Sequence, residues 1–295
     1  MKVTFWGTRG SIPTPGERTK KYGGNTSCVT VEVGNHLIIL DAGSGIRELG
    51  VVLKERSNNK PIEGHIFLSH THWDHIQGFP FFIPFLEKGN SFHIYGHAGT
   101  GKSIQSVLKK QMDDDFFPIG LGDLKAHLNF VDLKDAPITL KNNTIVSFTL
   151  LNHPGMSMAF KIEHNGKSIV YATDYEPYTV TLDNHKMMDY AYKESIISLD
   201  RKFDEFIKNV DVLICDGQYT QSEYETKIGW GHACIEHMIK TAVKDHVKKL
   251  ILFHHDPMHS DSFIDEIVQN EAAKLEKAGK KIILCAAQEG GEIIL

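Results

Sequence analysis

The hydrophobic positions of this chain fall into two kinds of pattern. Short apolar runs bounded by glycine, proline or charged residues predict β-strands, and longer stretches with helical spacing of apolar positions predict α-helices. We expect strands at residues 3–6, 28–33, 37–40, 65–69, 92–95, 128–133, 145–151, 158–163, 168–172, 212–215, 250–253 and 281–286. We expect helices at residues 45–55, 101–111, 195–209, 234–246 and 262–278.

The order of these elements indicates the fold class. The strands come in two groups, and helices follow each group. Such an order favours two sheets packed face to face, with the helices on the outside. The chain has 295 residues, and it shows no internal repeat and no low-complexity linker. We therefore expect one domain over residues 1–295.

Composition narrows the classes of function only mildly. The formal net charge of −5 argues against a broad nucleic-acid-binding surface. No apolar run approaches the roughly 18 residues of a membrane helix, and the N-terminus lacks the apolar segment of a signal peptide. The cysteines Cys28, Cys215, Cys234 and Cys285 form no CxxC pair. We expect a cytoplasmic protein without a membrane segment, in which these cysteines pack as small apolar residues.

Histidine and aspartate residues gather where predicted strands end. In α/β sheets ligands bind at the carboxyl ends of strands, so these positions are candidates for chemistry. Five predicted strands end in this way, which is more than coincidence supplies. The residues are, in chain order, His70, His72, Asp74, His75, His153, Asp174, Asp216, His254 and His255.

The stretch HTHWDH at residues 70–75 predicts a metal site. Positions two apart in an extended chain project to the same side, so His70 and His72 can converge on one ion. Asp74 and His75 are adjacent and diverge, which suits a second, neighbouring ion. Imidazole and carboxylate ligands together suit zinc, iron or manganese. We expect Trp73 only to pack between the ligands.

The later strand ends can complete two metal sites. His153 and His254 could finish the two ligand sets, and Asp174 could bridge both ions. His254 directly follows an apolar run and is preferred, while His255 remains the alternative ligand or a residue that faces the substrate. Two ions about 3.5–4 Å apart share a hydroxide and stabilise an in-line displacement.

These residues carry a family resemblance. HTHWDH, followed by His153, Asp174 and His254 in that order, resembles the metallo-β-lactamase superfamily, and the resemblance runs from VTFWGTRGS to the last predicted strand. It implies an α+β four-layer αββα sandwich with a dinuclear metal site between the sheet edges. It assigns His70, His72 and His153 to one ion, Asp74, His75 and His254 to the other, and Asp174 to both.

Other motifs resemble one branch of that superfamily. VTFWGTRGSIP, YGGNTSCVTVE and LIILDAGSGIRELG are similar to the phosphodiesterase branch, which includes tRNase Z-like and cyclic-nucleotide phosphodiesterase-like proteins. In that branch a carboxylate–histidine pair assists proton delivery. Asp216 in VLICDGQYT and His232 in GWGHA match that pair, so His232 is a candidate general acid that Asp216 orients. Asp74 is expected to bind metal and to orient the attacking hydroxide.

The expected function is hydrolysis of a small phosphodiester, such as a cyclic nucleotide, by attack of a metal-bridging hydroxide. Zinc is the expected metal, with manganese or iron as alternatives. A cysteine commonly takes the place of Asp174 in zinc β-lactamases, so this aspartate counts against antibiotic hydrolysis. A thioester or lactone hydrolase on the same dinuclear site remains an alternative. A di-iron ligand-binding or redox protein without hydrolysis is an alternative of another class.

The resemblance also bears on partners. tRNase Z proteins carry a long tRNA-gripping arm before the bridging aspartate, whereas only 20 residues lie between His153 and Asp174 here. Together with the acidic net charge, this predicts that tRNA is an improbable partner. A homodimer is left open, with residues 183–195 as a pocket wall or dimer contact. The candidate substrate contacts are Arg9, Asn25, Ser27 and His255.

Overall fold

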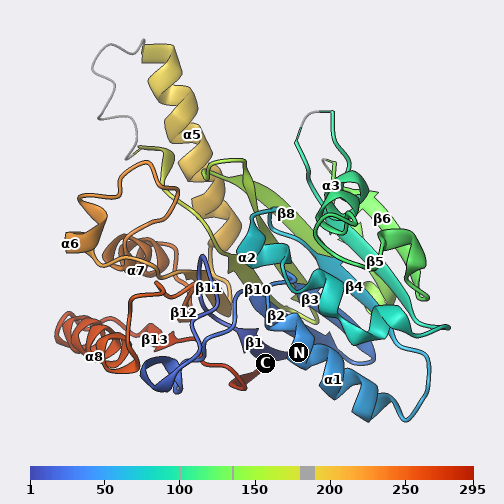
Figure 1. Ribbon diagram of the computed structural model, residues 1–295. Coiled ribbons are helices and arrows are strands. Elements are labelled where there is room, and N and C mark those ends of the chain that lie inside the picture. Colours follow the sequence, from blue (N-terminus) through green and yellow to red (C-terminus); the bar gives the residue numbers. More distant parts are fainter. Residues whose placement is uncertain (100, 135, 180–189) are drawn as a thin grey trace. The chain divides into compact units, whose positions relative to one another are not determined.

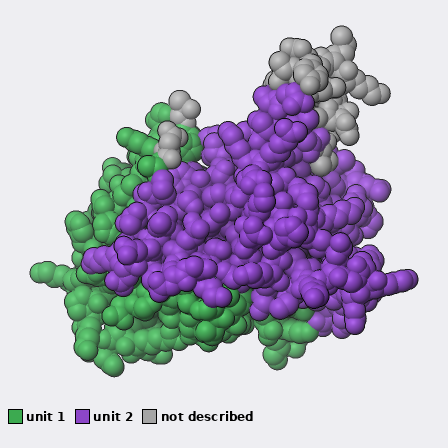
Figure 2. Space-filling model, turned by 180° about the vertical axis from the view of Figure 1, so that it is seen from behind, with its two compact units in different colours: residues 1–136, 288–295 green, residues 137–287 purple. Residues whose placement is uncertain are grey.

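The computed structural model describes residues 1–99, 101–134, 136–179 and 190–295. The chain divides into two compact units, which Figure 2 colours separately. Unit 1 comprises Met1–Ala136 and Gln288–Leu295, and unit 2 comprises Pro137–Ala287. Each unit is built on one seven-stranded mixed sheet. The expectation of one domain over residues 1–295 stays a prediction.

Unit 1 carries the sheet with strand order β14-β1-β2-β3-β4-β5-β6, of which Figure 1 labels β1 to β6. The four strands from β14 to β3 pair antiparallel, and the four from β3 to β6 pair parallel. Apolar residues of one sheet face, such as Ile39 and Ile66, form a core with Ile46 of α1 and Leu108 of α3. The strands are β1 Lys2–Gly7, β2 Cys28–Val33, β3 His36–Leu40, β4 Glu63–Phe67, β5 Ser91–Gly96, β6 His127–Asp132 and β14 Glu292–Ile294. The helices are α1 Ile46–Ser57, α2 Trp73–Ile76 and α3 Ile104–Gln111.

Unit 2 carries the sheet with strand order β13-β12-β11-β10-β9-β8-β7. The four strands from β13 to β10 are parallel, and those from β10 to β7 are antiparallel. The strands are β7 Ile138–Thr139, β8 Ile145–Leu151, β9 Ser157–His164, β10 Lys167–Ala172, β11 Val212–Asp216, β12 Lys249–Phe253 and β13 Ile283–Ala286. The helices are α5 Tyr190–Ile207, α6 Gln221–Tyr224, α7 Ile235–Lys244 and α8 Asp261–Lys277. Short 3-10 helices span Glu17–Thr19, Phe79–Phe81, Ile83–Leu86, Leu121–Asp123 and Lys141–Asn143 in the two units.

The register of the parallel strands brings polar residues to one edge of the unit 2 sheet. Ala172 of β10 pairs with Cys215 of β11, and Asp216 of β11 pairs with Phe253 of β12. The residues that follow these strands therefore emerge side by side at the carboxyl edge, where ligand sites form in such sheets. The hydrophobic pattern predicted all three strands, so the sequence already indicated which residues follow them at this edge.

Several elements differ from the expectation. Residues 73–76 form the one-turn helix α2 rather than an extended loop, so Asp74 and His75 diverge as helical neighbours. The last strand is β14, which returns the chain terminus to unit 1 and pairs with β1. Trp73 is 70% exposed and does not pack between ligands, so that expectation was wrong. None of the helices in the described part of the chain combines the length and apolar character that a bilayer crossing requires.

Candidate metal centre

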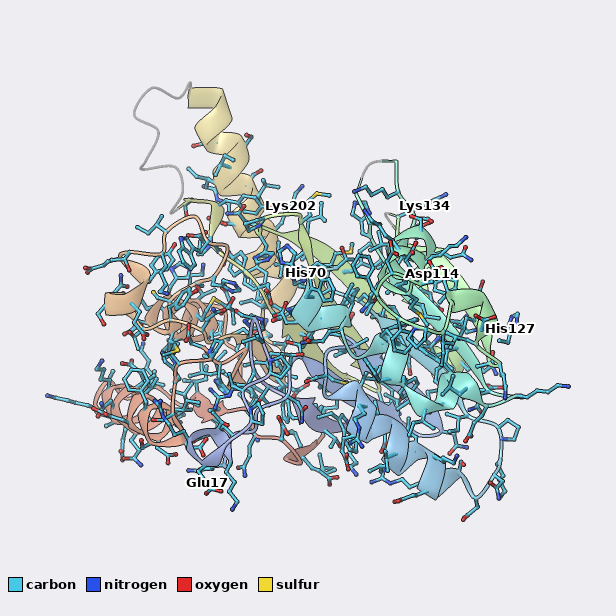
Figure 3. All side chains as sticks on the ribbon, viewed as in Figure 1. Glu17, His70, Asp114, His127, Lys134 and Lys202 are labelled. Carbon is cyan, nitrogen blue, oxygen red and sulfur yellow. The ribbon has the colours of Figure 1, made fainter. Side chains whose placement is uncertain are left out.

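Unit 1 gathers imidazoles directly after β4. His70, labelled in Figure 3, has its ring centroid 4.5 Å from that of His72 and 4.2 Å from that of His75. His70 and His75 are buried, while His72 is exposed. Asp74 Oδ2 lies 3.3 Å from His75 Nε2 and accepts a 2.7 Å hydrogen bond from the backbone N–H of Ser11. All of the predicted unit 1 ligands thus lie within one short segment.

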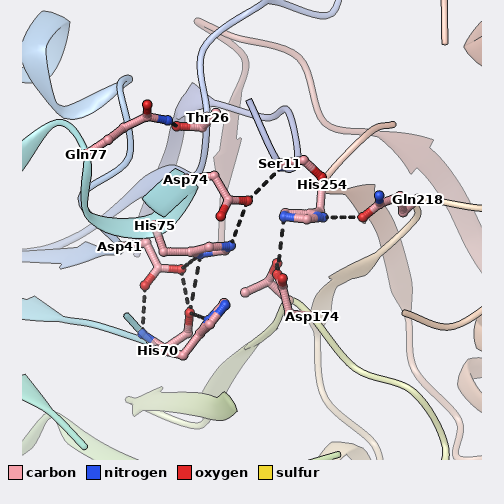
Figure 4. Close-up of polar contacts among 12 residues, drawn as sticks. Ser11, Thr26, Asp41, His70, Asp74, His75, Gln77, Asp174, Gln218 and His254 are labelled. Carbon is pink, nitrogen blue, oxygen red and sulfur yellow. Dashed lines mark hydrogen bonds and ion pairs between the residues drawn. The ribbon is translucent and has the colours of Figure 1, made fainter. Parts of the chain in front are cut away.

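Asp41 orients this segment, and the sequence reasoning missed it as a site residue. It directly follows β3 and is fully buried. Its Oδ2 accepts a hydrogen bond from His75 Nδ1 at 2.7 Å (Figure 4). Its Oδ2 also accepts one from the Ser69 hydroxyl at 2.8 Å, and its Oδ1 accepts one from the Ser69 N–H at 2.7 Å. The signal was present, because Asp41 is another acidic residue at the end of an apolar run.

Unit 2 gathers a second set of candidate ligands. Nε2 of His153 lies 3.7 Å from Asp174 Oδ2, and Nε2 of His254 lies 3.3 Å from Asp174 Oδ1. The three residues are buried, and Thr173 donates a 2.6 Å hydrogen bond to Asp174 Oδ1. A carboxylate between two imidazoles is a donor set that suits divalent transition metals.

His232 joins the same set. Its Nδ1 donates to Asp216 Oδ2 at 2.7 Å, its Nε2 lies 4.0 Å from Asp174 Oδ2, and its ring stacks on His254 at 5.1 Å between centroids. His153, Asp174 and His232 offer ligand atoms that all lie within 4.8 Å of one another, as do Asp216, His232 and His254. Within unit 2, the predicted carboxylate–histidine pair and the predicted ligands therefore lie together.

The two adjacent histidines after β12 have different surroundings. His254 Nδ1 lies 2.9 Å from Gln218 Oε1, and its Nε2 faces Asp174 (Figure 4). His255 Nε2 instead donates to the backbone oxygen of Ala287 at 3.0 Å. Gln218 was not singled out from the sequence, because nothing in its local pattern marks it.

The hydrogen bonds of the imidazoles fit them for metal binding. His75, His153 and His254 each direct Nδ1 at an oxygen of the protein, that of His153 being the Gly231 carbonyl at 2.9 Å. A ring that donates through Nδ1 carries its lone pair on Nε2, the form in which histidine binds metal, and such partners fix the ring orientation. The donor set and its hydrogen bonds thus fit the metal centre that the sequence predicts.

Strained backbone marks three residues of these clusters. Asp41, Asp174 and His254 each lie within two residues of the end of a strand and have φ values of 61°, 46° and 59°, in the left-handed region that non-glycine residues seldom adopt. Such conformations concentrate at functional sites, where the surroundings hold them in place. The left-handed conformation at each of these three residues sets the direction in which its side chain leaves the end of the strand.

The candidate substrate contacts lie mostly within hydrogen-bond networks of unit 1. Arg9 is fully buried and donates through Nε to the Gly23 carbonyl at 2.7 Å. Asn25 donates through its backbone N–H and Nδ2 to Glu289, at 2.6 and 3.1 Å. Burial raises the pKa of the Glu289 carboxyl, although these hydrogen bonds oppose the rise. Ser27 is fully buried, and residues 183–189 of the predicted wall segment lie outside the described residues.

Comparison with known proteins places the chain in a family. The family model described as "Beta-lactamase superfamily domain" matches residues 36–255, well over half of the chain. The chain belongs to the β-lactamase superfamily. It is 25% identical to the ribonuclease Z of Oceanobacillus iheyensis over 301 residues, which cover 93% of this chain and 95% of that relative.

Two solved structures share the fold of this chain. A diphosphatase of the PhnP family aligns with a TM-score of 0.66 and 15% identity, covering 100% of this chain and 97% of that one. Human tRNase Z, short form, aligns with a TM-score of 0.63 and 16% identity, covering 100% and 99%. The metallo-β-lactamase fold predicted from the sequence is confirmed. So is the prediction of a metal-dependent hydrolase, because the chain belongs to the β-lactamase superfamily and is similar to proteins named ribonuclease Z.

The prediction that tRNA is an improbable partner is wrong. The alignment covers 95% of the relative named ribonuclease Z, so that relative is no longer than this chain by any large segment. A protein of this length can therefore be a ribonuclease Z. The prediction relied on one insertion point, between His153 and Asp174, and on the net charge of the whole chain. Net charge is a sum that says little about the local potential around a site.

The superfamily fold implies a centre for two divalent metal ions, and His and Asp side chains with metal-binding chemistry are present in each unit. Each unit by itself contributes buried imidazoles with oriented rings and at least one carboxylate. The residue types thus meet what such a centre requires.

Proposed function

We propose that this β-lactamase-superfamily hydrolase cleaves a small phosphodiester, such as a cyclic nucleotide, and that His232 protonates the leaving oxygen. The contact that carries the proposal is the 2.7 Å hydrogen bond from His232 Nδ1 to the fully buried Asp216. A buried carboxylate orients the imidazole and stabilises its protonated form, so that Nε2 carries the proton to be transferred. His232 Nε2 lies beside Asp174, a proposed ligand, at 4.0 Å.

The proposed metal ligands are those that the sequence predicts: His70, His72, Asp74, His75, His153, Asp174 and His254. Two divalent metal ions, with zinc as the proposed metal, would supply Lewis acidity toward the phosphoryl and leaving oxygens. The chain itself orients the ligands, through Asp41 for His75, Gly231 for His153 and Gln218 for His254. We prefer His254 to His255 because the ring of His255 is directed at the Ala287 carbonyl.

Asp74 has a second proposed role besides ligation. Its Oδ2 is held by the Ser11 N–H at 2.7 Å and lies 3.3 Å from His75 Nε2. A carboxylate fixed in this way can orient an attacking hydroxide by accepting a hydrogen bond from it. His75 would thus bind metal, and Asp74 would both bind metal and orient the nucleophile, from the same helical turn.

The experiment is a substrate panel with the purified protein and added zinc, manganese or iron. Bis-p-nitrophenyl phosphate and 2′,3′- and 3′,5′-cyclic nucleotides test the proposal, and p-nitrophenyl acetate, a lactone and a thioester test acyl hydrolysis. Turnover of phosphodiesters that a chelator abolishes is the expected result. Hydrolysis of acyl substrates alone would refute the proposal.

A second candidate substrate is the 3′ end of a precursor tRNA. It is favoured by the relative named ribonuclease Z, which matches over 95% of its length. Incubation with a labelled precursor tRNA carrying a 3′ trailer separates the candidates. Cleavage at the trailer together with slow turnover of cyclic nucleotides would favour RNA as the substrate.

His232 also lies close enough to Asp174 to be a ligand itself, so its role needs its own test. We expect His232→Ala to retain two equivalents of zinc by elemental analysis and to lose about 10²–10⁴-fold in kcat, the usual contribution of a general acid. Loss of one zinc equivalent would show that His232 binds metal and would refute its assignment as the acid.

A further inference from the structure

A buried carboxylate that the proposed chemistry does not use lies two residues after Asp174. Glu176 is only 1% exposed, and glutamate is seldom buried so completely unless its oxygens are paired. Its Oε1 accepts hydrogen bonds from the Tyr224 hydroxyl at 2.5 Å and from the Gly229 N–H at 2.8 Å. Its Oε2 accepts one from the Gly231 N–H at 2.9 Å.

These hydrogen bonds connect Glu176 to the backbone around two histidines of unit 2. Gly231, whose N–H is bound by Glu176, offers its carbonyl oxygen to His153 Nδ1 at 2.9 Å and directly precedes His232. The backbone N–H of Glu176 also donates to the carbonyl of Asn152 at 2.9 Å, just before His153. The side chain and the backbone N–H of Glu176 together thus connect the three chain segments that present Asp174, His153 and His232.

The loop that Glu176 holds also has hydrogen bonds of its own, from the Lys227 N–H to the Tyr224 carbonyl at 2.8 Å and from the Trp230 N–H to the Lys227 carbonyl at 3.1 Å. Gly229 and Gly231 have φ values of 88° and 91°, in the region that favours glycine. Between them Trp230 is 60% exposed, and the preceding Ile228 is 39% exposed, so these large side chains contribute little buried apolar area. Gly231 itself is held on one side by its N–H bond to Glu176 and on the other by its carbonyl contact with His153.

We propose that Glu176 is a positioning residue that sets the orientation of His153 and the placement of His232 through the backbone of Gly231. The part that concerns His232 rests on the proposed function, whereas the part that concerns His153 rests on metal binding alone. Residues that orient the ligands of a metal centre typically contribute 10–100-fold to metal affinity or activity.

The test uses Glu176→Gln in the full chain. An amide cannot serve both glycines, because its NH₂ group must face either the Gly229 N–H or the Gly231 N–H, and a donor facing a donor is unfavourable. We expect zinc affinity, measured by competition with a chromogenic chelator, to fall by about 10–100-fold. With saturating zinc we expect kcat on an aryl methyl phosphodiester with a poor phenol leaving group to fall while KM stays within about twofold, the pattern of an interaction made in the transition state.

A matched control is Glu223→Gln in the same unit. Glu223 accepts hydrogen bonds from the Thr220 hydroxyl at 2.7 Å and from His259 Nε2 at 2.8 Å, and it contacts none of the proposed ligands. We expect this variant to lower the melting temperature and to leave zinc affinity and kcat at their wild-type values. The comparison separates positioning from a general loss of stability.

Wild-type zinc affinity and kcat in Glu176→Gln, with only a lower melting temperature, would overturn the proposal. If that variant does not fold, Tyr224→Phe removes a single donor to Glu176 and should still cost about two- to tenfold in zinc affinity; an unchanged affinity would then overturn it. If the wild-type protein cleaves no phosphodiester, the proposed function fails, and the affinity comparison still decides the role of Glu176.

Discussion

Replacing Asp216 by asparagine tests the proposed proton donor most directly. Asp216 Oδ2 accepts from His232 Nδ1 at 2.7 Å, and its Oδ1 accepts from the Gln218 N–H at 3.0 Å. Both oxygens face N–H donors, so the NH₂ group of an asparagine must oppose one of them. Either the imidazole loses its acceptor or the turn at Gln218 shifts.

The expected magnitude follows from the bond that is lost. A hydrogen bond to a charged group contributes about 1.5–3 kcal/mol, more when burial prevents water from replacing the partner. At 1.36 kcal/mol per factor of ten, this is about a 10- to 160-fold loss in kcat. The double variant with His232→Ala should lose no more than His232→Ala alone, because residues that act as a unit are not additive.

The assay is a series of aryl methyl phosphodiesters whose phenol leaving groups rise in pKa. A missing proton donor matters most for poor leaving groups, so the dependence of kcat on leaving-group pKa should steepen in Asp216→Asn. The matched control is Asp211→Asn, just before the opposite end of β11, where Lys248 and the Ser168 N–H are the partners. We expect the control to keep the wild-type dependence.

An equal loss of kcat across the whole series would refute this reasoning. So would loss of zinc from Asp216→Asn, because the variant would then report on metal binding rather than on proton transfer. Zinc content is measured by elemental analysis of each variant after dialysis.

Three further outcomes are expected. Asp41→Asn removes the carboxylate that orients His75, and zinc affinity by chelator competition should fall about 10–100-fold; an unchanged affinity contradicts that role. Gly231→Ala places a Cβ 2.3 Å from His153 Nδ1 and should lower zinc affinity. Its control is Gly279→Ala, where φ is also positive at 64° but an added Cβ meets no atom within 4 Å; this variant should lower only the free energy of unfolding, by about 1 kcal/mol. Burial raises the pKa of Asp211, but hydrogen bonds and the neighbouring lysine charges outweigh it and lower the pKa below its ordinary value. The ionised Asp211 carboxylate therefore stabilises the fold above its ordinary pKa, and this stabilisation is lost as pH falls through the lowered pKa. In urea titrations, Asp211→Asn should be about 1 kcal/mol less stable than the wild type at pH 7, and the difference should vanish in acid.

Several features of the fold followed from the hydrophobic pattern. Strand β8 spans residues 145–151, as the sequence predicts, and β9 and β10 form a hairpin around the turn between them. A buried strand needs a continuous or alternating apolar run, so its position is written in its own residues. Helix α2 and strand β14 were missed because each is too short to carry a periodic signal, and β14 exists only through its pairing with β1.

The candidate ligands were predictable for a similar reason. His70, His75, Asp174 and His254 follow or closely follow apolar strands, and strand ends are where α/β sheets expose polar groups. Their residue types alone indicate divalent metal chemistry.

The partners that orient those ligands were decided by tertiary structure. Glu176, Gln218 and Asp41 lie 55, 36 and 34 positions from the Gly231, His254 and His75 atoms that they bind. No local pattern encodes contacts across such separations, because they arise only when strand pairing brings distant strand ends to one edge of a sheet. The sequence by itself therefore determined which residues can bind metal, since that depends on chemical type and on local strand boundaries. The tertiary structure decided which nitrogen each histidine presents and how firmly it is held, since both depend on hydrogen bonds that only the assembled sheet can form.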